Sequence, residues 1–299
     1  MPGEFDFLEW IRSQRPIGAG DLVLVGPGDD LAILKWPAAD LLIVGVDQVL
    51  DGVHFVSTQH APRLIGRKVM NRNLSDCAAM ACLPAAAVVS AALPIDCDLD
   101  YAKELHLGLR EAAGLFNCEI VGGDTGSWAG RLALSVTILG RSAGITPIQR
   151  SGARVGDHLF VTGALGGSLL GRHMTFTPRV ALARELAAKH PISAMIDISD
   201  GLSRDLRHLC TQSGVGAMID AASVPIHDDA IAMSRVDGRS PVDHSLNDGE
   251  DHELLFTCGD ECVEGAHRIG TIVSERNIWL QHTDHREVLA PRGWEHRLL

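Results

Sequence analysis

The chain has 299 residues and a formal net charge of -12, and its 46% hydrophobic and 21% charged content is typical of a globular protein. The length predicts two domains of about 150 residues each, and acidity without a basic stripe argues against nucleic acid as a partner. No apolar run reaches the roughly 18 residues that a membrane span needs, and the seven cysteines form no CxxC pair. We therefore expect a cytoplasmic protein without a membrane segment.

The first half is predicted to form one α+β layer. It begins with an amphipathic helix over 3–13 and a strand pair, 21–25 and 32–36, around the turn at 26–30. A buried strand over 41–46 is expected to end at Asp47. Then follow a helix at 63–83, a strand at 85–93, a helix at 99–116, and strands at 118–121 and 132–139. These elements predict an N-terminal domain of residues 1–148.

The second half, residues 149–299, is predicted to be an α/β domain. It opens with a turn-rich segment at 150–157. Strands are expected at 158–162, 194–198, 217–219 and 254–257, and helices at 179–189 and 202–213. The glycine-rich segment 163–171 is either a tight strand-to-helix turn or a phosphate cradle at a helix N-terminus.

One polar cluster stands out in the stretch 71–84. Asn73, Ser75 and Asp76 lie among small and apolar residues that favour helix, and Pro84 is expected to stop that helix. A polar cluster at a helix entrance either caps the helix or holds a ligand.

Aspartates beside Gly or Ser recur at predicted strand ends and helix starts: Asp30, Asp47, Asp76, Asp124, Asp197 and Asp200. Each alone is typical of a turn or an N-cap. Together they suggest carboxylates that converge at one sheet edge, where they would repel one another unless cations neutralise them. Proteins bind Mg²⁺ through a few carboxylates and substrate phosphates. Metal-dependent phosphate chemistry is the hypothesis that follows.

The motifs of other nucleotide-dependent enzymes are absent from the sequence. It contains no GxxxxGK[ST] P-loop and no HRD or DFG set of the protein kinases. His54 follows a small turn and is either a packed loop residue or a ligand. Trp294 is either an anchor for the C-terminal tail or a stacking partner for a flat ring.

Taken together, these segments resemble the thiamine-monophosphate kinase family, within the superfamily of aminoimidazole ribonucleotide synthetase. The resemblance runs in order over nearly the whole chain. Its most specific parts are Asn73-Leu74-Ser75-Asp76 with Ala78-Ala79-Met80, Asp197-Ile198-Ser199-Asp200-Gly201-Leu202, and Gly249-Glu250-Asp251. It implies an N-terminal mixed sheet with helices that pairs with its copy in a homodimer, and a C-terminal α/β domain.

The resemblance also implies roles for single residues. The aspartates named above would hold several Mg²⁺ ions that bridge the phosphates of ATP and of the acceptor. Contacts to the nucleotide are implied for Gly123, Asp124, Arg150, Ser199 and, where relatives can carry an aromatic residue, His106. Contacts to thiamine monophosphate are implied for His54, Glu250 and Trp294. No general base is assigned, because an acceptor phosphate with a second pKa of about 6 is already largely dianionic at neutral pH.

The chain departs from the family pattern in several places. Gly45 and Val46 stand where the family has Thr or Ser before Asp47, so a side-chain metal ligand is lost. His252 replaces the Tyr of the family's GGEDYEL, and the segment between Gly171 and Pro178 is shorter than usual. These departures keep two alternatives open: an ATP-dependent enzyme of the superfamily with a different acceptor, and a non-catalytic nucleotide-binding homologue.

Overall fold

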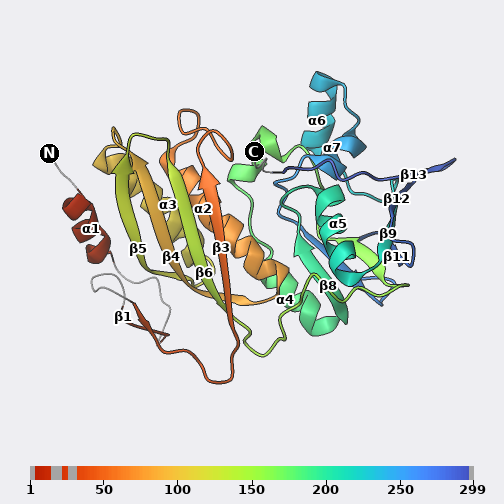
Figure 1. Ribbon diagram of the computed structural model, residues 1–299, viewed down its shortest axis with the longest axis horizontal. Coiled ribbons are helices and arrows are strands. Elements are labelled where there is room, and N and C mark those ends of the chain that lie inside the picture. Colours follow the sequence, from red (N-terminus) through yellow and green to blue (C-terminus); the bar gives the residue numbers. More distant parts are fainter. Residues whose placement is uncertain (1–3, 15–21, 26–31, 296–299) are drawn as a thin grey trace. The chain divides into compact units, whose positions relative to one another are not determined.

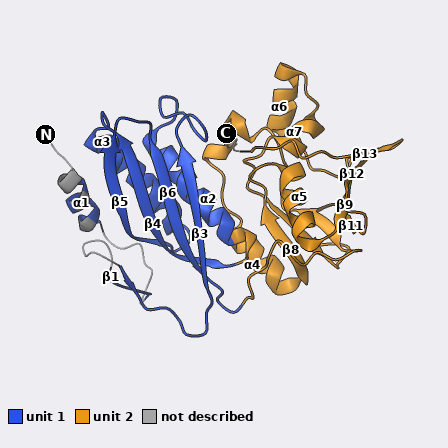
Figure 2. Cartoon of the chain, in the orientation of Figure 1, with its two compact units in different colours: residues 1–77, 82–144 blue, residues 78–81, 145–299 orange. Residues whose placement is uncertain are grey.

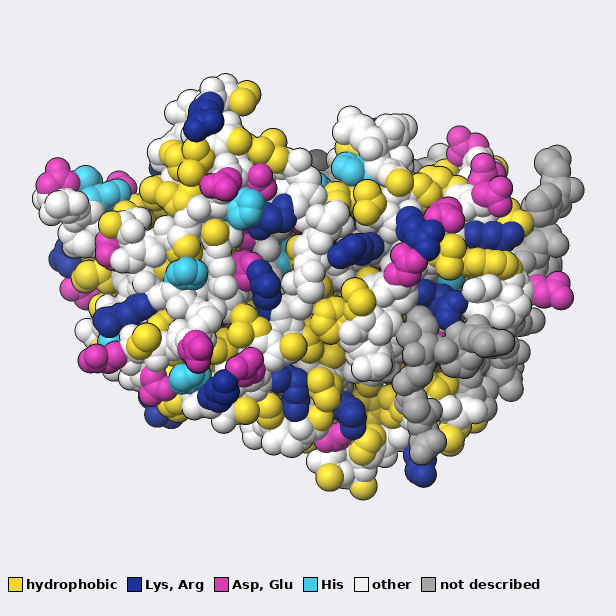
Figure 3. All heavy atoms as spheres, turned by 180° about the vertical axis from the view of Figure 1, so that it is seen from behind, with side chains coloured by type: hydrophobic (Ala, Val, Ile, Leu, Met, Phe, Trp, Pro, Cys, Tyr) yellow, Lys and Arg dark blue, Asp and Glu magenta, His cyan; other side chains and the backbone are white. Residues whose placement is uncertain are grey.

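The computed structural model describes residues 4–14, 22–25 and 32–295, and the chain divides into two compact units (Figure 1, Figure 2). Unit 1 comprises Met1–Cys77 and Cys82–Gly144, and unit 2 comprises Ala78–Ala81 and Ile145–Leu299. Among the described residues, no helix is long and apolar enough to cross a membrane. On the face drawn in Figure 3, acidic and basic side chains are interspersed.

Unit 1 is built on a four-stranded sheet in the order β3-β6-β4-β5. The strands are β3 (Leu42–Leu50), β4 (Leu83–Pro94), β5 (Glu119–Trp128) and β6 (Ala133–Arg141). β4 and β5 are parallel, and the other neighbours are antiparallel. Figure 1 shows α2 (Pro62–Ala79) and α3 (Leu99–Gly114) on one face of this sheet. A short helix, α1 (Glu4–Ser13), and a ribbon of β1 (Val23–Val25) and β2 (Ile33–Leu34) complete the unit.

The alternation of β6 determines which face of the sheet the helices cover. Leu134, Val136 and Ile138 are buried, while the residues between them stay half-buried. The two helices cross closely at glycines, since a Cβ on Gly66 would lie only 2.1 Å from the carbonyl oxygen of Leu105. The core of unit 1 thus lies between the helix pair and one face of the sheet.

Unit 2 contains a seven-stranded mixed sheet in the order β13-β12-β9-β11-β7-β10-β8. Its strands are β7 (His158–Val161), β8 (Ile192–Asp197), β9 (Gly216–Asp220), β10 (Leu254–Cys258), β11 (His267–Val273), β12 (Ile278–Gln281) and β13 (Arg286–Val288). Its helices are α4 (Val180–Lys189), α5 (Leu202–Ser213), α6 (Asp228–Asp237) and α7 (Pro241–Asn247), with short 3₁₀ turns η2 (Ser168–Leu170) and η3 (Arg172–Met174). Leu206 and Leu209 of α5 pack with Ile196, Ile219 and Leu255 in one core cluster.

The predicted two-domain mixed architecture is confirmed, but three aspartates do not lie at the ends of elements as predicted. β3 continues through Asp47 to Leu50, and β5 continues through Asp124 to Trp128. Cross-strand pairing with β6 and β4 keeps both strands going past glycines that favour a turn. Asp76 lies near the end of α2 and not at its start. Asp197 does end β8, and Asp200 lies just before α5.

The predicted end of α2 at Pro84 is also wrong. The helix ends at Ala79, Ala81 has a φ of 52°, and Pro84 lies within β4. Because α2 begins at Pro62, the cluster at Asn73 and Asp76 cannot be an N-cap. Capping is therefore excluded as the reason for these polar side chains.

Candidate functional site

In unit 2, backbone hydrogen bonds tie together the three segments that carry predicted site residues. The loop after β8 holds Asp197, Ser199 and Asp200. Glu250 donates its N–H to the carbonyl of Ser199 over 2.8 Å, and Trp294 donates its N–H to the carbonyl of Asp200 over 2.9 Å. The structure therefore brings these five predicted residues together at the carboxyl end of β8.

Two glycines permit this close approach of backbones. A Cβ on Gly293 would lie 2.0 Å from the carbonyl oxygen of Asp200. Gly249 has a φ of 75°, and a Cβ there would lie 2.8 Å from the carbonyl oxygen of Ser199. The glycines before Glu250 and Trp294 thus have a structural reason, which is to bring those two residues against the loop.

The side chain of Asp205 on α5 accepts hydrogen bonds from the backbone of the same loop. Its Oδ2 accepts the N–H groups of Asp200 and Gly201, both over 3.1 Å. Burial first, and then the charges of Asp197 and Asp200, raise the pKa of Asp205 well above its usual value. The loop therefore gathers negative charge that a bound cation would relieve.

His252 is buried between two of the predicted residues. Its Nδ1 lies 3.4 Å from Oδ2 of Asp197, and its Nε2 lies 3.3 Å from Oε2 of Glu250. Burial disfavours a charged ring, but the contacts to both carboxylates outweigh burial and raise the pKa of His252. His252 thus links the loop after β8 to the Glu250 segment.

The glycine-rich segment after β7 is a turn, and carboxylates already accept the amides of two of its glycines. The N–H of Gly166 donates to Oδ1 of Asp251 over 2.9 Å, and that of Gly167 donates to Oδ2 of Asp248 over 3.0 Å. The short η2 turn follows, in place of an α-helix. These carboxylates occupy two of the amides that a phosphate cradle could use.

In unit 1, Arg72 of α2 connects the surroundings of Asp47 and Asp76. Arg72 is one helical turn before Asp76 on α2, and its Nε pairs with Oδ2 of Asp47 on β3 over 2.9 Å. Asp47 lies opposite the buried Val136 of β6 and so faces the helices. Asn73 follows Arg72 on α2 and is buried. Its Oδ1 accepts no hydrogen bond within the described residues, which is unusual for a buried amide.

Gly123 and Asp124 lie on the opposite edge strand of the same sheet. β5 is separated from β3 by β4 and β6, which places the backbones of Asp124 and Asp47 about 14 Å apart at ordinary strand spacing. A Cβ on Gly123 would lie 2.0 Å from the carbonyl oxygen of Val89, so β5 approaches β4 closely there. Within one chain, the sheet therefore does not bring Asp47 and Asp124 to one ion.

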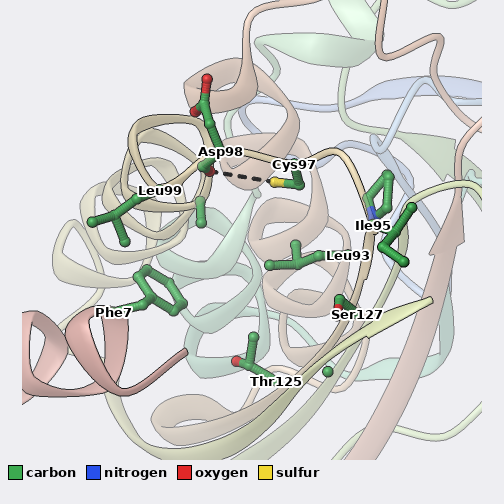
Figure 4. A pocket seen from close by; sticks show the side chains of 11 residues that line it. Phe7, Leu93, Ile95, Cys97, Asp98, Leu99, Thr125 and Ser127 are labelled. Carbon is green, nitrogen blue, oxygen red and sulfur yellow. Dashed lines mark hydrogen bonds between the residues drawn. The ribbon is translucent and has the colours of Figure 1, made fainter. Parts of the chain in front are cut away.

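A cavity of ≈ 280 Å³ lies just after these residues, beside Thr125, Gly126 and Ser127 (Figure 4). Its other walls come from the start of α3 at Asp98 and Leu99, the end of β4, and Phe7 of α1. Figure 4 shows Phe7 and Leu99 on the side away from Ser127. The cavity thus combines an apolar wall with polar groups of β5 and the α3 N-terminus.

The remaining predicted residues have varied surroundings. His106 is buried in α3 against Phe7 and Trp10, with ring centroids 6.2 and 5.6 Å away. His54 accepts the N–H of Leu50 at its Nδ1 over 3.0 Å, so its proton is on Nε2. Arg150 is exposed just before β7. Asp30 lies outside the described residues.

Sequence reasoning missed Arg72 and Asp205, which hold predicted ligands in place. Arg72 belongs to the stretch that the sequence singled out, but its partner Asp47 is 25 residues away. Asp205 lies five residues after Asp200 on a helix whose start was predicted. The signal that could have identified Asp205 was a second carboxylate in the first turn of the predicted helix.

Comparison with known families supports one assignment for both halves of the chain. Residues 28–142 match the model of the AIR synthase related protein N-terminal domain, and residues 158–281 match that of its C-terminal domain. The thiamine-monophosphate kinase of Rhodopirellula baltica is 40% identical over 291 residues, which cover 92% of either chain. That of Mycobacterium tuberculosis is 34% identical over 312 residues, covering 98% of this chain and 91% of the relative.

Solved structures give the same result. Thiamine-monophosphate kinase from Stenotrophomonas maltophilia K279a superposes with a TM-score of 0.77 at 31% identity, covering 92% of this chain and 94% of the relative. The structure of AaThiL complexed with AMPPCP and TMP superposes with a TM-score of 0.79 at 27% identity, covering 99% and 97%. The chain matches both AIR synthase related domains and belongs to the thiamine-monophosphate kinase family.

Proposed function

We propose that the chain phosphorylates thiamine monophosphate to thiamine diphosphate with ATP as donor. The observation that carries this proposal is the meeting of Asp197, Ser199 and Asp200 with Glu250 and Trp294. These are segments of the family pattern, and a relative's structure with AMPPCP and TMP supports the same pair of substrates. A cytoplasmic location stays a prediction from the sequence.

Mg²⁺ is the cation that the carboxylates suit best. Within the described residues, no three His, Cys, Asp or Glu side chains form a group that could hold a metal by themselves. Mg²⁺ does not need such a cage, because it takes one or two carboxylates and completes its shell with waters and phosphate oxygens. Asp197 and Asp200 in unit 2, and Asp30, Asp47, Asp76 and Asp124 in unit 1, would hold the ions.

For this reaction, the protein has to align the two substrates and neutralise the charge of their phosphates. The acceptor phosphate is largely dianionic at neutral pH and attacks without losing a proton to a base. Bound Mg²⁺ would supply the charge that offsets repulsion between acceptor and ATP phosphates. Glu250 and His54 would orient the acceptor, and the exposed indole of Trp294 offers a face for stacking on its aromatic part.

For the nucleotide, we propose the region around Gly123 and the cavity beside Thr125–Ser127. The apolar wall with Phe7 and Leu99 suits a flat base, and Asp124 lies on the same strand, one residue before Thr125. His106 contacts the Phe7 ring edge-on. It would therefore support a base bound in the cavity indirectly, by holding the Phe7 ring in place. Arg150 and Ser199 remain the proposed contacts from unit 2.

A homodimer through unit 1 is the proposed assembly. On the sheet face away from α2 and α3, Val44 and Val46 of β3 are 58% and 64% exposed. Thr137 of β6 lies opposite Val46 on one side and opposite Val88 of β4 on the other, and Val88 is also exposed. The valines therefore lie in one row across the sheet, with Thr137 between Val46 and Val88. A row of exposed aliphatic side chains on a sheet is a typical protein interface, and a second copy offers the complementary face.

The first test is an ADP-release assay with Mg²⁺, ATP and thiamine monophosphate, with thiamine diphosphate identified by chromatography. Product that requires both substrates and disappears with a chelator is the expected result. Release of ADP with another phosphorylated acceptor only would identify a different enzyme of the superfamily. ATP binding without turnover would identify a non-catalytic homologue, for which the loss of the hydroxyl at Gly45 and Val46 is the specific reason.

A further inference from the structure

Two buried aromatic side chains far apart in the sequence contact each other in unit 2. His252 lies shortly before β10, and Phe176 lies between Gly171 and Pro178. Their rings stack with centroids 4.0 Å apart and an interplanar angle of 12°. Both side chains are buried. The two residues therefore form one packed unit, although 76 positions separate them in the sequence.

The His252 ring reaches one carboxylate from each of its nitrogens. Nδ1 lies 3.4 Å from Asp197 and Nε2 lies 3.3 Å from Glu250. Asp197 is a proposed metal ligand, and Glu250 is a proposed ligand of the acceptor. A Tyr has one hydroxyl at the tip of its ring and cannot bridge two carboxylates on opposite edges. The bridge therefore depends on the two ring nitrogens of His252.

The backbone holds the ring in this bridging position. His252 donates its N–H to the carbonyl of Ile198 over 2.8 Å. Glu250 and His252 have φ values of 57° and 52°, which non-glycine residues adopt at a cost. Residues in such conformations are found where the surroundings fix them, often at functional sites. An ordinary core histidine would need neither the paired carboxylates nor this backbone.

We propose that His252 is a positioning residue that couples the metal-binding carboxylate Asp197 to the acceptor-binding carboxylate Glu250, with Phe176 fixing its ring. A cation bound at Asp197 changes the position of that carboxylate, and the ring transmits the change to Glu250. Mg²⁺ and thiamine monophosphate then bind cooperatively in this chain. This inference rests on the proposed function and adds a link between its two ligands.

The test is calorimetric binding of thiamine monophosphate to the AMPPCP-loaded protein at low and at saturating Mg²⁺. We expect the wild type to bind the acceptor at least about fivefold more tightly at saturating Mg²⁺. His252→Phe keeps the stack on Phe176 but removes both nitrogens. It should lower the Mg²⁺ effect on the acceptor Kd at least about twofold below that of the wild type, leaving the part that comes from charge neutralisation between the phosphates. His208→Phe, an exposed change on α5, should keep the wild-type ratio.

A second variant guards against misfolding of the first. Phe176→Leu leaves His252 in place but frees its ring, and it should lower the Mg²⁺ effect on the acceptor Kd below that of the wild type. A wild-type ratio in the folded His252→Phe or, should that variant not fold, in Phe176→Leu would overturn the coupling while leaving the kinase function intact. No Mg²⁺ effect in the wild type would overturn it as well. Failure of the wild type to bind the acceptor at all would reject the proposed function, and the coupling with it.

Discussion

Arg72 of α2 and Asp47 of β3 form an ion pair, with 2.9 Å between Nε and Oδ2 and side chains only 13% and 30% exposed. The pair fixes the carboxylate of Asp47 on the helix-covered side of the sheet. Arg72 also lies one helical turn before Asp76 on α2. Asp47 thus has a structural partner in addition to its proposed role as a metal ligand, and the two roles can be separated by mutation.

We predict that Asp47→Asn lowers kcat about a hundredfold at limiting Mg²⁺, because it removes a charge placed for the cation. Arg72→Met removes the same ion pair from its other side and should cost about 1 kcal/mol of unfolding free energy, with a loss in kcat of less than about tenfold. Steady-state kinetics and urea unfolding of both variants provide the measurement. Equal losses of activity in the two variants would mean that Asp47 matters only as the partner of Arg72.

Two neighbouring glycines provide a matched pair in β5. A Cβ on Gly123 would lie 2.0 Å from a backbone oxygen of β4, whereas a Cβ on Gly122 would meet nothing within 4 Å. Gly123→Ala should therefore destabilise the protein by about 2 kcal/mol or more, and Gly122→Ala should stay within about 0.5 kcal/mol of the wild type. Thermal unfolding together with AMPPCP titration measures both. A stable Gly123→Ala that loses AMPPCP would instead assign Gly123 to the nucleotide alone.

The sequence predicted the elements whose apolar pattern is strong. α5 has the predicted bounds of 202–213, since Leu202, Leu206 and Leu209 mark its buried face. α6 was missed because Ala230 is its one buried residue, so it has almost no apolar stripe to detect. Its signals are at its ends, where His227 caps the helix and Gly238 takes a left-handed conformation.

For the site, the sequence identified the residue types but not their partners. Asp197 and Glu250 meet because β8 and the segment before β10 are neighbours, and that follows from strand order. No local pattern gives that order. Asp47 and Asp124 were expected to end strands because glycines lie close before each of them. Cross-strand pairing nevertheless extends both strands. Tertiary pairing overrode local turn preference in both cases.

The dimer proposal predicts that one charge on the open sheet face dissociates the protein. Val46→Lys places an ammonium in the middle of the exposed aliphatic row, and burial of an unpaired charge costs several kcal/mol. Light scattering should then give the monomer mass at concentrations where the wild type is a dimer. Val236→Lys, at an 89% exposed position of α6, is the control and should remain dimeric. A monomeric wild type would exclude this interface.

Burial, followed by the charge of Arg110, lowers the pKa of His106 from 6.5 to about 4. The folded state therefore holds a neutral ring, while the unfolded chain takes up a proton once the pH falls below its ordinary pKa. The stability linked to His106 is present above pH 6.5 and is lost progressively between pH 6.5 and 4.

His106→Leu removes this titration and should flatten the pH dependence of unit 1. Between pH 7.5 and pH 5 the variant should lose about 2 kcal/mol less unfolding free energy than the wild type, because each pKa unit corresponds to about 1.4 kcal/mol. Urea unfolding at the two pH values, followed by hydrogen exchange of α3 peptides, measures the difference. His60→Leu, in the turn before α2, should keep the wild-type slope. A wild-type slope in His106→Leu would mean that the ring gains solvent in the folded state and is not held neutral against Phe7 and Trp10.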